Sequence, residues 1–209
     1  MLRFSPLVLL AAGTGVLAAT MAVAGSGAYR HRYLIERSFA PGALDGLDAA
    51  TKRKVNAANA SLGVEWIRSY ANADKTRTFC VYEGPSEAAV REAAKLNALP
   101  VDRVTEVPVD LEPGPSPQPE GARPAHRYLV ERSFPAGALD GLDAAGKAKV
   151  NANNDSLGVR WINSYANAEK TRTFCVYEGP SEQAVRDAAA LNDIPVDAVV
   201  EIPVDLEPR

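Results

Sequence analysis

The sequence predicts an α+β protein built from two tandem domains, each an antiparallel sheet with the element order β-α-β-β-α-β. The first observation behind this prediction is a long internal repeat. Residues 31–113 align with residues 126–208 without a gap, and roughly four in five aligned residues are identical. The second observation is the order in which β-rich and alanine-rich stretches follow one another within each copy. A unit of this length can bury a small core of its own, so the repeat indicates two domains and not a solenoid.

The first half of each copy predicts a strand, a helix and a second strand. In the first copy, residues 31–39 alternate apolar and polar side chains, as a half-buried strand does. Asp48 can cap the helix predicted at residues 49–62, and Gly63 can adopt the left-handed conformation that ends it. Residues 64–71 predict the second strand.

The second half of each copy predicts a hairpin partner, another helix and a last strand. Residues 77–83 predict the third strand. Ser86 is a natural N-cap for a helix that ends before Pro100. Residues 102–109 predict the last strand, in which Pro108 marks an edge position. This order of elements is the split β-α-β, or ferredoxin-like, arrangement.

Helices on one face of such a sheet leave the other face open. Trp66, Tyr70 and Tyr82 are too large for two alanine-rich helices to cover, and an exposed aromatic face calls for a partner. The second copy offers a matching sheet at high effective concentration. We therefore expect the two sheets to pack against each other as an intramolecular pseudo-dimer, within a monomeric chain.

Residues 1–28 have the composition of a secretory signal peptide. Arg3 is followed by an apolar stretch at residues 6–24 and then by small residues, a pattern typical of export signals. Cleavage is expected after Ala24 or after Ala28; otherwise the segment stays in place as a membrane anchor. We expect a periplasmic or secreted protein that contacts a membrane only through this segment, if it is uncleaved.

The two expected domains span residues 29–112 and 126–209, and a proline-rich linker at residues 113–125 joins them. Proline discourages helix in the residue before it, so the linker should be an extended spacer. A proline-rich segment can also be a ligand for an aromatic groove. The formal net charge of −3 lacks the basic excess that phosphate binding requires, so nucleic acid is not an expected partner.

Several short motifs of each copy resemble one bacterial family. In the first copy they are Tyr-x-x-Glu-Arg (33–37), Leu-Gly-x-x-Trp (62–66), Ser-Tyr (69–70), Cys-x-Tyr (80–82) and Glu-x-x-x-Arg (87–91). Together they resemble a family of small ferredoxin-fold domains of unknown function, related to a nickel-binding protein. The resemblance implies domains that dimerise and a divalent metal such as nickel as the ligand. A histidine that the family often carries in its second helix is replaced here by Ala93 and Ala188.

Two histidines are the first metal candidates. His31 and His126 occupy equivalent positions at the start of each copy, and imidazole is a common ligand for nickel, copper and zinc. Glu36 and Glu131 follow five positions later, which is about 16 Å along a strand, so a histidine and a glutamate of one copy cannot share an ion. A site would have to join the copies, for example His31 with Glu131. The alternative is a polar strand-start residue copied by the duplication.

A different metal site would arise from cleavage after Ala28. The new terminus would read Tyr29-Arg30-His31, whose amine, two amide nitrogens and imidazole suit square-planar copper or nickel. His126 has no terminal amine beside it, so this chelate explains only one of the two histidines.

The two cysteines, Cys80 and Cys175, lie at equivalent positions on the third strand of each copy. In an exported protein such a pair invites a disulfide between the domains. A buried free thiol on a central strand is the alternative that we favour.

No catalytic motif is present: there is no glycine-rich phosphate loop, no His-Glu-x-x-His and no Gly-x-Ser-x-Gly. Carboxylates occur at Glu36, Glu83, Glu106 and Asp110 in the first copy. They could act as acid–base groups in a cleft, but we interpret them as solvated strand-edge groups whose ion-pair partners are Arg37, Arg77 and Arg91.

These observations favour an exported, non-enzymatic binding protein for a divalent metal such as nickel. Two alternatives stay open. One is a small-molecule enzyme with a cleft between the sheets, lined by Tyr33, Tyr70, Tyr82 and their copies. The other is a protein-interaction module that uses an exposed sheet face. The expected partner is therefore a metal ion or a small molecule.

Overall fold

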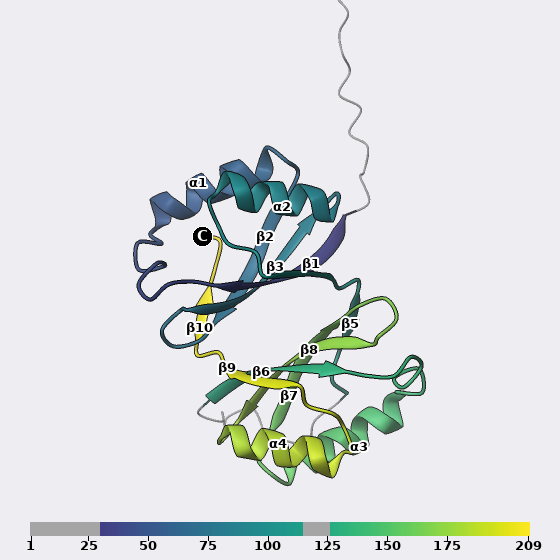
Figure 1. Cartoon of the computed structure of the whole chain (residues 1–209). Coiled ribbons are helices and arrows are strands. Elements are labelled where there is room, and N and C mark those ends of the chain that lie inside the picture. Colours follow the sequence, from purple (N-terminus) through teal and green to yellow (C-terminus); the bar gives the residue numbers. More distant parts are fainter. Residues whose placement is uncertain (1–29, 115–125) are drawn as a thin grey trace, which may run out of the picture.

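The computed structural model describes residues 30–114 and 126–209 (Figure 1). The expected signal peptide (1–28) and nearly all of the expected linker (113–125) lie outside the described residues. In the part of the chain that is described, no helix combines the length and apolarity that crossing a membrane requires.

Each repeat contributes five strands and two helices. The elements of the first repeat are β1 (His31–Ser38), α1 (Ala49–Ala60), β2 (Glu65–Ala71), β3 (Arg77–Gly84), α2 (Glu87–Leu96), β4 (Arg103–Glu106) and β5 (Val109–Leu111). Those of the second are β6 (His126–Ser133), α3 (Ala144–Asp155), β7 (Arg160–Ala166), β8 (Arg172–Gly179), α4 (Glu182–Leu191), β9 (Ala198–Glu201) and β10 (Val204–Leu206). The predicted β-α-β-β-α-β order is confirmed in both repeats.

The helices begin and end where the sequence signals them. The Asp48 carboxylate accepts a hydrogen bond of 2.7 Å from the backbone N–H of Thr51 at the start of α1. The Ser86 hydroxyl accepts one of 3.2 Å from the N–H of Ala89 at the start of α2. Gly63 has a φ of 68°, in the left-handed region that glycine adopts without a steric penalty.

The last short strand of each repeat belongs to the sheet of the other repeat. The strand orders are β10-β2-β3-β1-β4 and β5-β7-β8-β6-β9, so β5 pairs with β7 and β10 pairs with β2, both antiparallel. The prediction of one strand at 102–109 is wrong in this respect. Pro108 has no N–H, so pairing with β1 stops there, and the chain crosses to the other sheet.

The crossing segments also reach the helices of the opposite repeat. After β10, the Pro208 carbonyl accepts a hydrogen bond of 2.7 Å from the Asn56 side chain of α1. After β5, the Gly114 carbonyl accepts one of 2.9 Å from Asn151 of α3. The exchange therefore ties each sheet and each helical layer to both halves of the chain.

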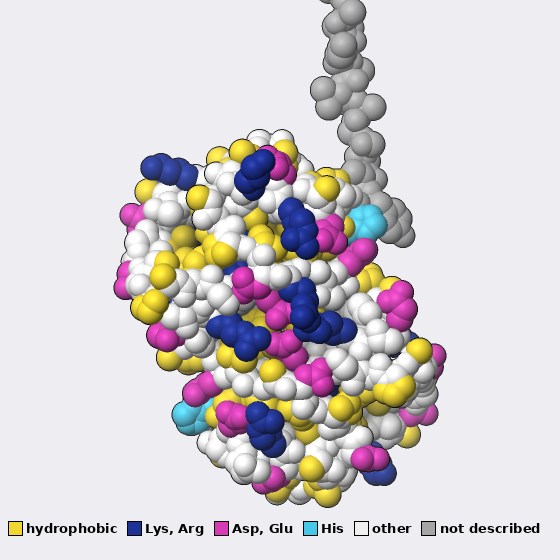
Figure 2. Space-filling view, viewed as in Figure 1, with side chains coloured by type: hydrophobic (Ala, Val, Ile, Leu, Met, Phe, Trp, Pro, Cys, Tyr) yellow, Lys and Arg dark blue, Asp and Glu magenta, His cyan; other side chains and the backbone are white. Residues whose placement is uncertain are grey.

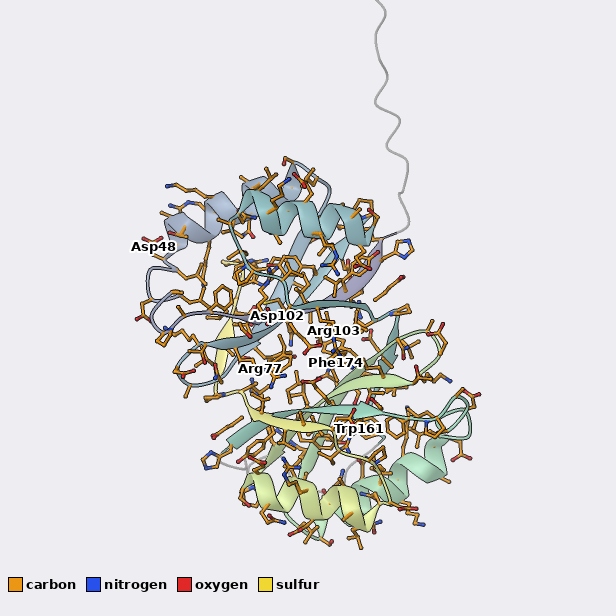
Figure 3. All side chains as sticks on the ribbon, in the orientation of Figure 1. Asp48, Arg77, Asp102, Arg103, Trp161 and Phe174 are labelled. Carbon is orange, nitrogen blue, oxygen red and sulfur yellow. The ribbon has the colours of Figure 1, made fainter. Side chains whose placement is uncertain are left out.

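The two sheets pack face to face, with α1 and α2 on the outer face of one sheet and α3 and α4 on the outer face of the other (Figure 1). The expected pseudo-dimer is thus confirmed. The apolar layer between the sheets consists of Leu34, Tyr70, Phe79, Val81, Val107, Leu129, Tyr165, Phe174, Val176 and Ile202. Phe174 is labelled in Figure 3, where it lies between the two sheets.

A second and a third core lie between each sheet and its own helices. Trp66 and Tyr82 belong to the core under α1 and α2, where they are only 6% and 5% exposed. These two aromatic side chains therefore do fit under the helices, but the expectation that Trp66, Tyr70 and Tyr82 cannot all do so is confirmed. Tyr70 does reach the layer between the sheets, and its hydroxyl lies 3.5 Å from that of Tyr165.

Replacing Phe174 by alanine tests the shared core. Phe174 is fully buried between the sheets, and removing such a ring costs about 3–5 kcal/mol. Because both repeats contribute to this layer, the chain should still unfold in one transition, at a lower denaturant midpoint, when followed by circular dichroism. Leu191→Ala, at a side chain that is 54% exposed, should change stability by less than about 0.5 kcal/mol. Two separate transitions in the parent protein would contradict a shared core.

Candidate functional site

Each histidine forms a short contact with a glutamate from the neighbouring edge strand. His31 Nδ1 lies 2.7 Å from Glu106 Oε1, and His126 Nδ1 lies 2.6 Å from Glu201 Oε1. All four side chains are between 38% and 47% exposed, so both pairs are accessible from solvent. The same His–Glu pair is thus built twice, once in each half of the molecule.

Strand pairing explains why the two residues meet. β1 pairs with β4 antiparallel, with Tyr33 opposite Glu106, so His31 is the diagonal neighbour of Glu106 on the same face. Burial raises the pKa of Tyr33, and the Glu106 carboxylate raises it further. Glu106 is recognisable in the sequence as a strand-edge carboxylate, but its contact with His31 is not. The adjacency of first and last strands in a β-α-β-β-α-β sheet is the signal that could have found it.

Glu36 and Glu131 meet at the seam between the two sheets, with arginines around them. Glu131 accepts hydrogen bonds of 2.7 Å from Arg77 and 2.8 Å from Arg172. Arg172 also donates to Glu36 at 3.3 Å, and Arg103 Nε lies 3.8 Å from the same carboxylate. Arg77 and Arg103 are labelled at this seam in Figure 3, and basic and acidic side chains gather over it in Figure 2.

This seam does not have the character of a cation site. Three guanidinium groups surround two carboxylates, so the local charge is positive and repels a divalent cation. Arg77 is an ion-pair partner of Glu36, at 3.7 Å, as predicted. Within residues 30–114 and 126–209, Arg37 forms no ion pair with an acid: it donates to the Pro100 carbonyl, and its guanidinium lies 5.7 Å from the centre of the Tyr82 ring.

The expected pairing of His31 with Glu131 is not formed. Glu131 lies beside Glu36, because Arg77 and Arg172 contact both carboxylates, whereas His31 contacts Glu106 near the other end of β1. Among residues 30–114 and 126–209, no three His, Cys, Asp or Glu side chains are grouped so that they could hold a metal ion. The histidines and the two central glutamates therefore form separate sites.

The positions that often carry a histidine in the resembled family are buried here. Ala93 of α2 and Ala188 of α4 are each 2% exposed and face the helix side of their sheets. These positions contribute to the core in this chain and offer no metal ligand.

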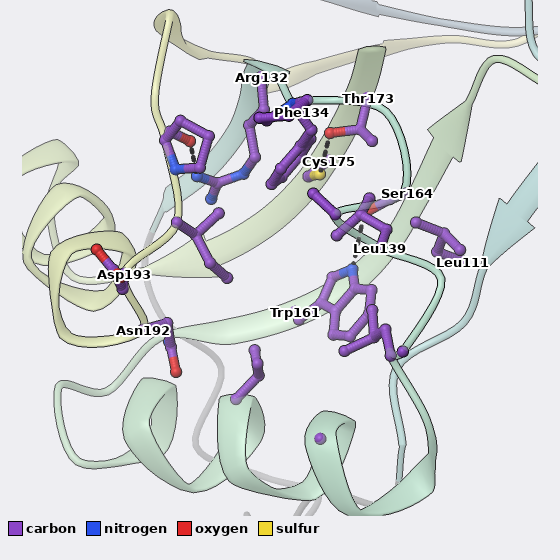
Figure 4. Close-up of a pocket in the computed structure, with 18 of the residues that line it drawn as sticks. Leu111, Arg132, Phe134, Leu139, Trp161, Ser164, Thr173, Cys175, Asn192 and Asp193 are labelled. Carbon is purple, nitrogen blue, oxygen red and sulfur yellow. Dashed lines mark hydrogen bonds between the residues drawn. The ribbon is translucent and has the colours of Figure 1, made fainter. Parts of the chain in front are cut away.

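The second repeat contains a cavity of about 530 Å³ between its sheet and the segment that leads into α3 (Figure 4). Its floor consists of the buried residues Arg132, Trp161, Thr173, Cys175 and Tyr177. Its rim includes exposed residues such as Pro135 and Asp193. The cavity is therefore open on one side and apolar on most of its walls.

This cavity is not where the enzyme alternative placed a cleft. The space between the sheets is filled by the apolar layer around Phe79 and Phe174, and Tyr33 and Tyr82 lie on the helix side of their sheet. The equivalent cavity of the first repeat is only about 40 Å³. The two repeats therefore differ in the space between the sheet and the first helix of the repeat.

Both cysteines are free and buried. Cys80 and Cys175 lie in the separate helix-side cores, with each Sγ 3.3 Å from a threonine hydroxyl of its own strand. The favoured prediction of buried free thiols is confirmed, and the two helix-side cores keep the sulfurs apart.

The central carboxylates predict a pH dependence of stability. Burial raises the pKa of Glu36, and the neighbouring Glu131 carboxylate raises it further. The folded state therefore binds this proton more tightly than the unfolded state. At pH values above the raised pKa, the ionised Glu36 side chain lowers the free energy of unfolding. This destabilisation disappears as the pH falls below the ordinary pKa of a glutamate, where the carboxyl is protonated in both states.

Glu36→Gln mimics the protonated acid and tests this dependence. The variant should gain stability relative to the parent protein at pH 8, and the difference should shrink toward pH 4 in urea unfolding. Glu65→Gln, at a side chain that is 55% exposed, serves as the control and should show a smaller dependence. A parent protein that loses stability relative to Glu36→Gln as pH falls would contradict the account.

Comparison with solved structures finds similar folds at low identity. A mutant chlorite dismutase from Candidatus Nitrospira defluvii shares 9% identity over 83% of this chain and 90% of that one, with a TM-score of 0.43. An anthrone oxidase-like protein shares 11% identity over 85% and 93%, with a TM-score of 0.42. Both scores lie below 0.5, so we draw nothing about function from them. No curated protein matches the sequence.

A family model matches both repeats, at residues 33–107 and 128–202. Its description is "Nickel responsive protein SCO4226-like". The two matches span most of the chain and coincide with the β1–β4 and β6–β9 units. The resemblance noted in the sequence is thereby confirmed, and the chain belongs to the nickel responsive SCO4226-like family with two tandem copies of the family domain.

Proposed function

We propose that this protein is an exported, non-enzymatic binding protein for a divalent metal such as nickel, and that His31–Glu106 and His126–Glu201 are its binding sites. The observation that carries the proposal is the duplication of one accessible His–Glu pair in a chain of a nickel responsive family.

The geometry of each pair suits chelation. Imidazole nitrogen and carboxylate oxygen bind divalent first-row metals at about 2.1 Å, so adjacent ligands on one ion lie about 3 Å apart. The donor atoms are separated by 2.7 Å and 2.6 Å, so a small opening of each pair admits an ion. The metal replaces the hydrogen bond between the two side chains, and both ligands have to be deprotonated.

Two protein ligands leave most of the coordination sphere to water. Such sites bind weakly and exchange quickly, which suits a protein that takes up and releases metal and does not hold it permanently. Export is supported by the signal-like composition of residues 1–28, which would bring the sites into contact with metal outside the cytoplasm.

Nickel titration of the processed protein by isothermal calorimetry tests the sites. The parent protein should bind two nickel ions, His31→Ala and His126→Ala one each, and the double variant none. Glu106→Gln and Glu201→Gln should weaken their own site at least tenfold, because a neutral amide oxygen is a poorer ligand. Glu36→Gln, at the arginine-rich seam, is the control and should leave nickel binding unchanged. Full binding by the double histidine variant would overturn the proposal.

Cell fractionation with intact-mass measurement tests export. The protein should be found outside the cytoplasm, with a mass that begins at Gly25 or Tyr29, and deletion of residues 2–24 should keep it inside. A mass that begins at Tyr29, with one nickel lost only in His31→Ala, would replace the His–Glu sites by the terminal chelate. An unprocessed cytoplasmic protein would contradict export.

A further inference from the structure

The cavity of the second repeat has features that metal binding by the His–Glu pairs does not use. The two repeats have nearly the same sequence, and most residues that line the cavity are identical to their counterparts in the first repeat. Leu139, Leu142, Val150, Trp161, Cys175 and Tyr177 correspond to Leu44, Leu47, Val55, Trp66, Cys80 and Tyr82. Yet the volumes are about 530 Å³ and 40 Å³. A few substitutions have therefore opened one copy.

Four wall positions differ from their counterparts in the first repeat: Pro135, Gly146, Asp193 and Ile194 stand where that repeat has Ala40, Thr51, Ala98 and Leu99. Gly146 lines the cavity from the first turn of α3, whereas Thr51 is exposed and does not line the smaller cavity. A Cβ at Gly146 would lie 3.4 Å from Leu142 Cδ1 and 3.5 Å from Asp143 Oδ1, which are ordinary contacts. Close packing thus does not require glycine here, although glycine in a helix costs about 0.5–1 kcal/mol relative to alanine.

A buried cation lies at the floor of the cavity. Arg132 is 2% exposed; its nearest polar side chains are those of Tyr177 and Cys175, and among the described residues no carboxylate forms an ion pair with it. Its guanidinium donates to the Pro195 carbonyl and lies 5.5 Å from the centre of the Tyr177 ring, while its Nε has no hydrogen-bond partner. A buried charge without a counter-charge is costly, and an anion in the cavity would offset that cost.

The first repeat has the buried arginine without a cavity of comparable size. Arg37 has the same surroundings as Arg132, with a proline carbonyl, a tyrosine ring and an unpaired Nε, but almost no cavity beside it. The arginine alone is therefore compatible with a purely structural role. In the described residues, the second repeat combines the arginine with space for a ligand, and the first does not.

We propose that the cavity of the second repeat binds a monoanionic amphiphile, an apolar chain or ring system that carries one carboxylate. The carboxylate would contact Arg132, and the apolar part would lie against Trp161, Leu139 and Val150. Asp193 lies on the exposed rim, where water screens its charge from a carboxylate bound at Arg132. A volume of about 530 Å³ lies in the range of small-molecule sites.

Calorimetric titration with decanoate, in the presence of EDTA, tests the proposal. One decanoate should bind per chain, at least tenfold more tightly than 1-decanol or decylamine of the same length. Val150→Phe puts a larger side chain into the cavity wall and should weaken decanoate binding at least tenfold, whereas the matched change Val55→Phe in the first repeat should leave it unchanged. The double variant of His31 and His126 should still bind decanoate, so this site and the proposed metal sites can fail independently.

Two results would overturn the proposal. One is the absence of saturable decanoate binding in the parent protein, or unchanged binding in Val150→Phe. The other is equal affinity for decanoate and 1-decanol, which would show that Arg132 does not recognise the anion. Arg132→Met should reduce decanoate to the affinity of 1-decanol, whereas Arg37→Met should not. If Arg132→Met fails to fold, the comparison of the three ligands on the parent protein decides.

Discussion

Phe79, Phe174 and the apolar side chains around them can leave water only if the two repeats lie sheet against sheet, and the rest of the structure depends on this packing. It holds the repeats in one arrangement, and β5 and β10 then cross between the sheets and fix their register. The same arrangement brings Glu36 and Glu131 together, where Arg77 and Arg172 bind both carboxylates and close the edge of the apolar layer. Glu36 and Glu131, which the sequence offered as metal ligands, therefore form ion pairs at the contact between the two repeats.

Duplication within one chain allows the two halves to diverge while the interface is preserved. The apolar layer and the His–Glu pairs occur in both halves, as they would in a dimer of single domains. The cavity between the sheet and the first helix has a volume of about 530 Å³ in the second repeat and about 40 Å³ in the first. A symmetric dimer could not make this distinction, because every substitution would appear twice. We infer that the fused chain separates two tasks: paired metal sites at the sheet edges and one small-molecule site under α3.

Much of the fold could be predicted because local signals and global packing agree. Asp48, Ser86 and Gly63 mark helix ends by their own chemistry, and one-sided helical cover predicts a sheet-to-sheet contact. The strand exchange could not be predicted, since Pro108 is equally compatible with an edge strand and with a break. The His31–Glu106 pair required knowing the register of β1 against β4. The cavity could not be predicted, because most of its wall residues are identical to those around the much smaller cavity of the first repeat.

Expression of the two repeats as separate chains, residues 30–112 and 126–209, tests the central claim most directly. Each repeat alone lacks the strand that the other supplies and leaves its half of the apolar layer uncovered. Analytical ultracentrifugation should therefore find each repeat as a homodimer or unfolded, and an equimolar mixture should recover a one-to-one complex with the circular dichroism of the full chain. A repeat that remains a folded monomer at micromolar concentration would contradict the account, because its sheet would then be stable without a partner.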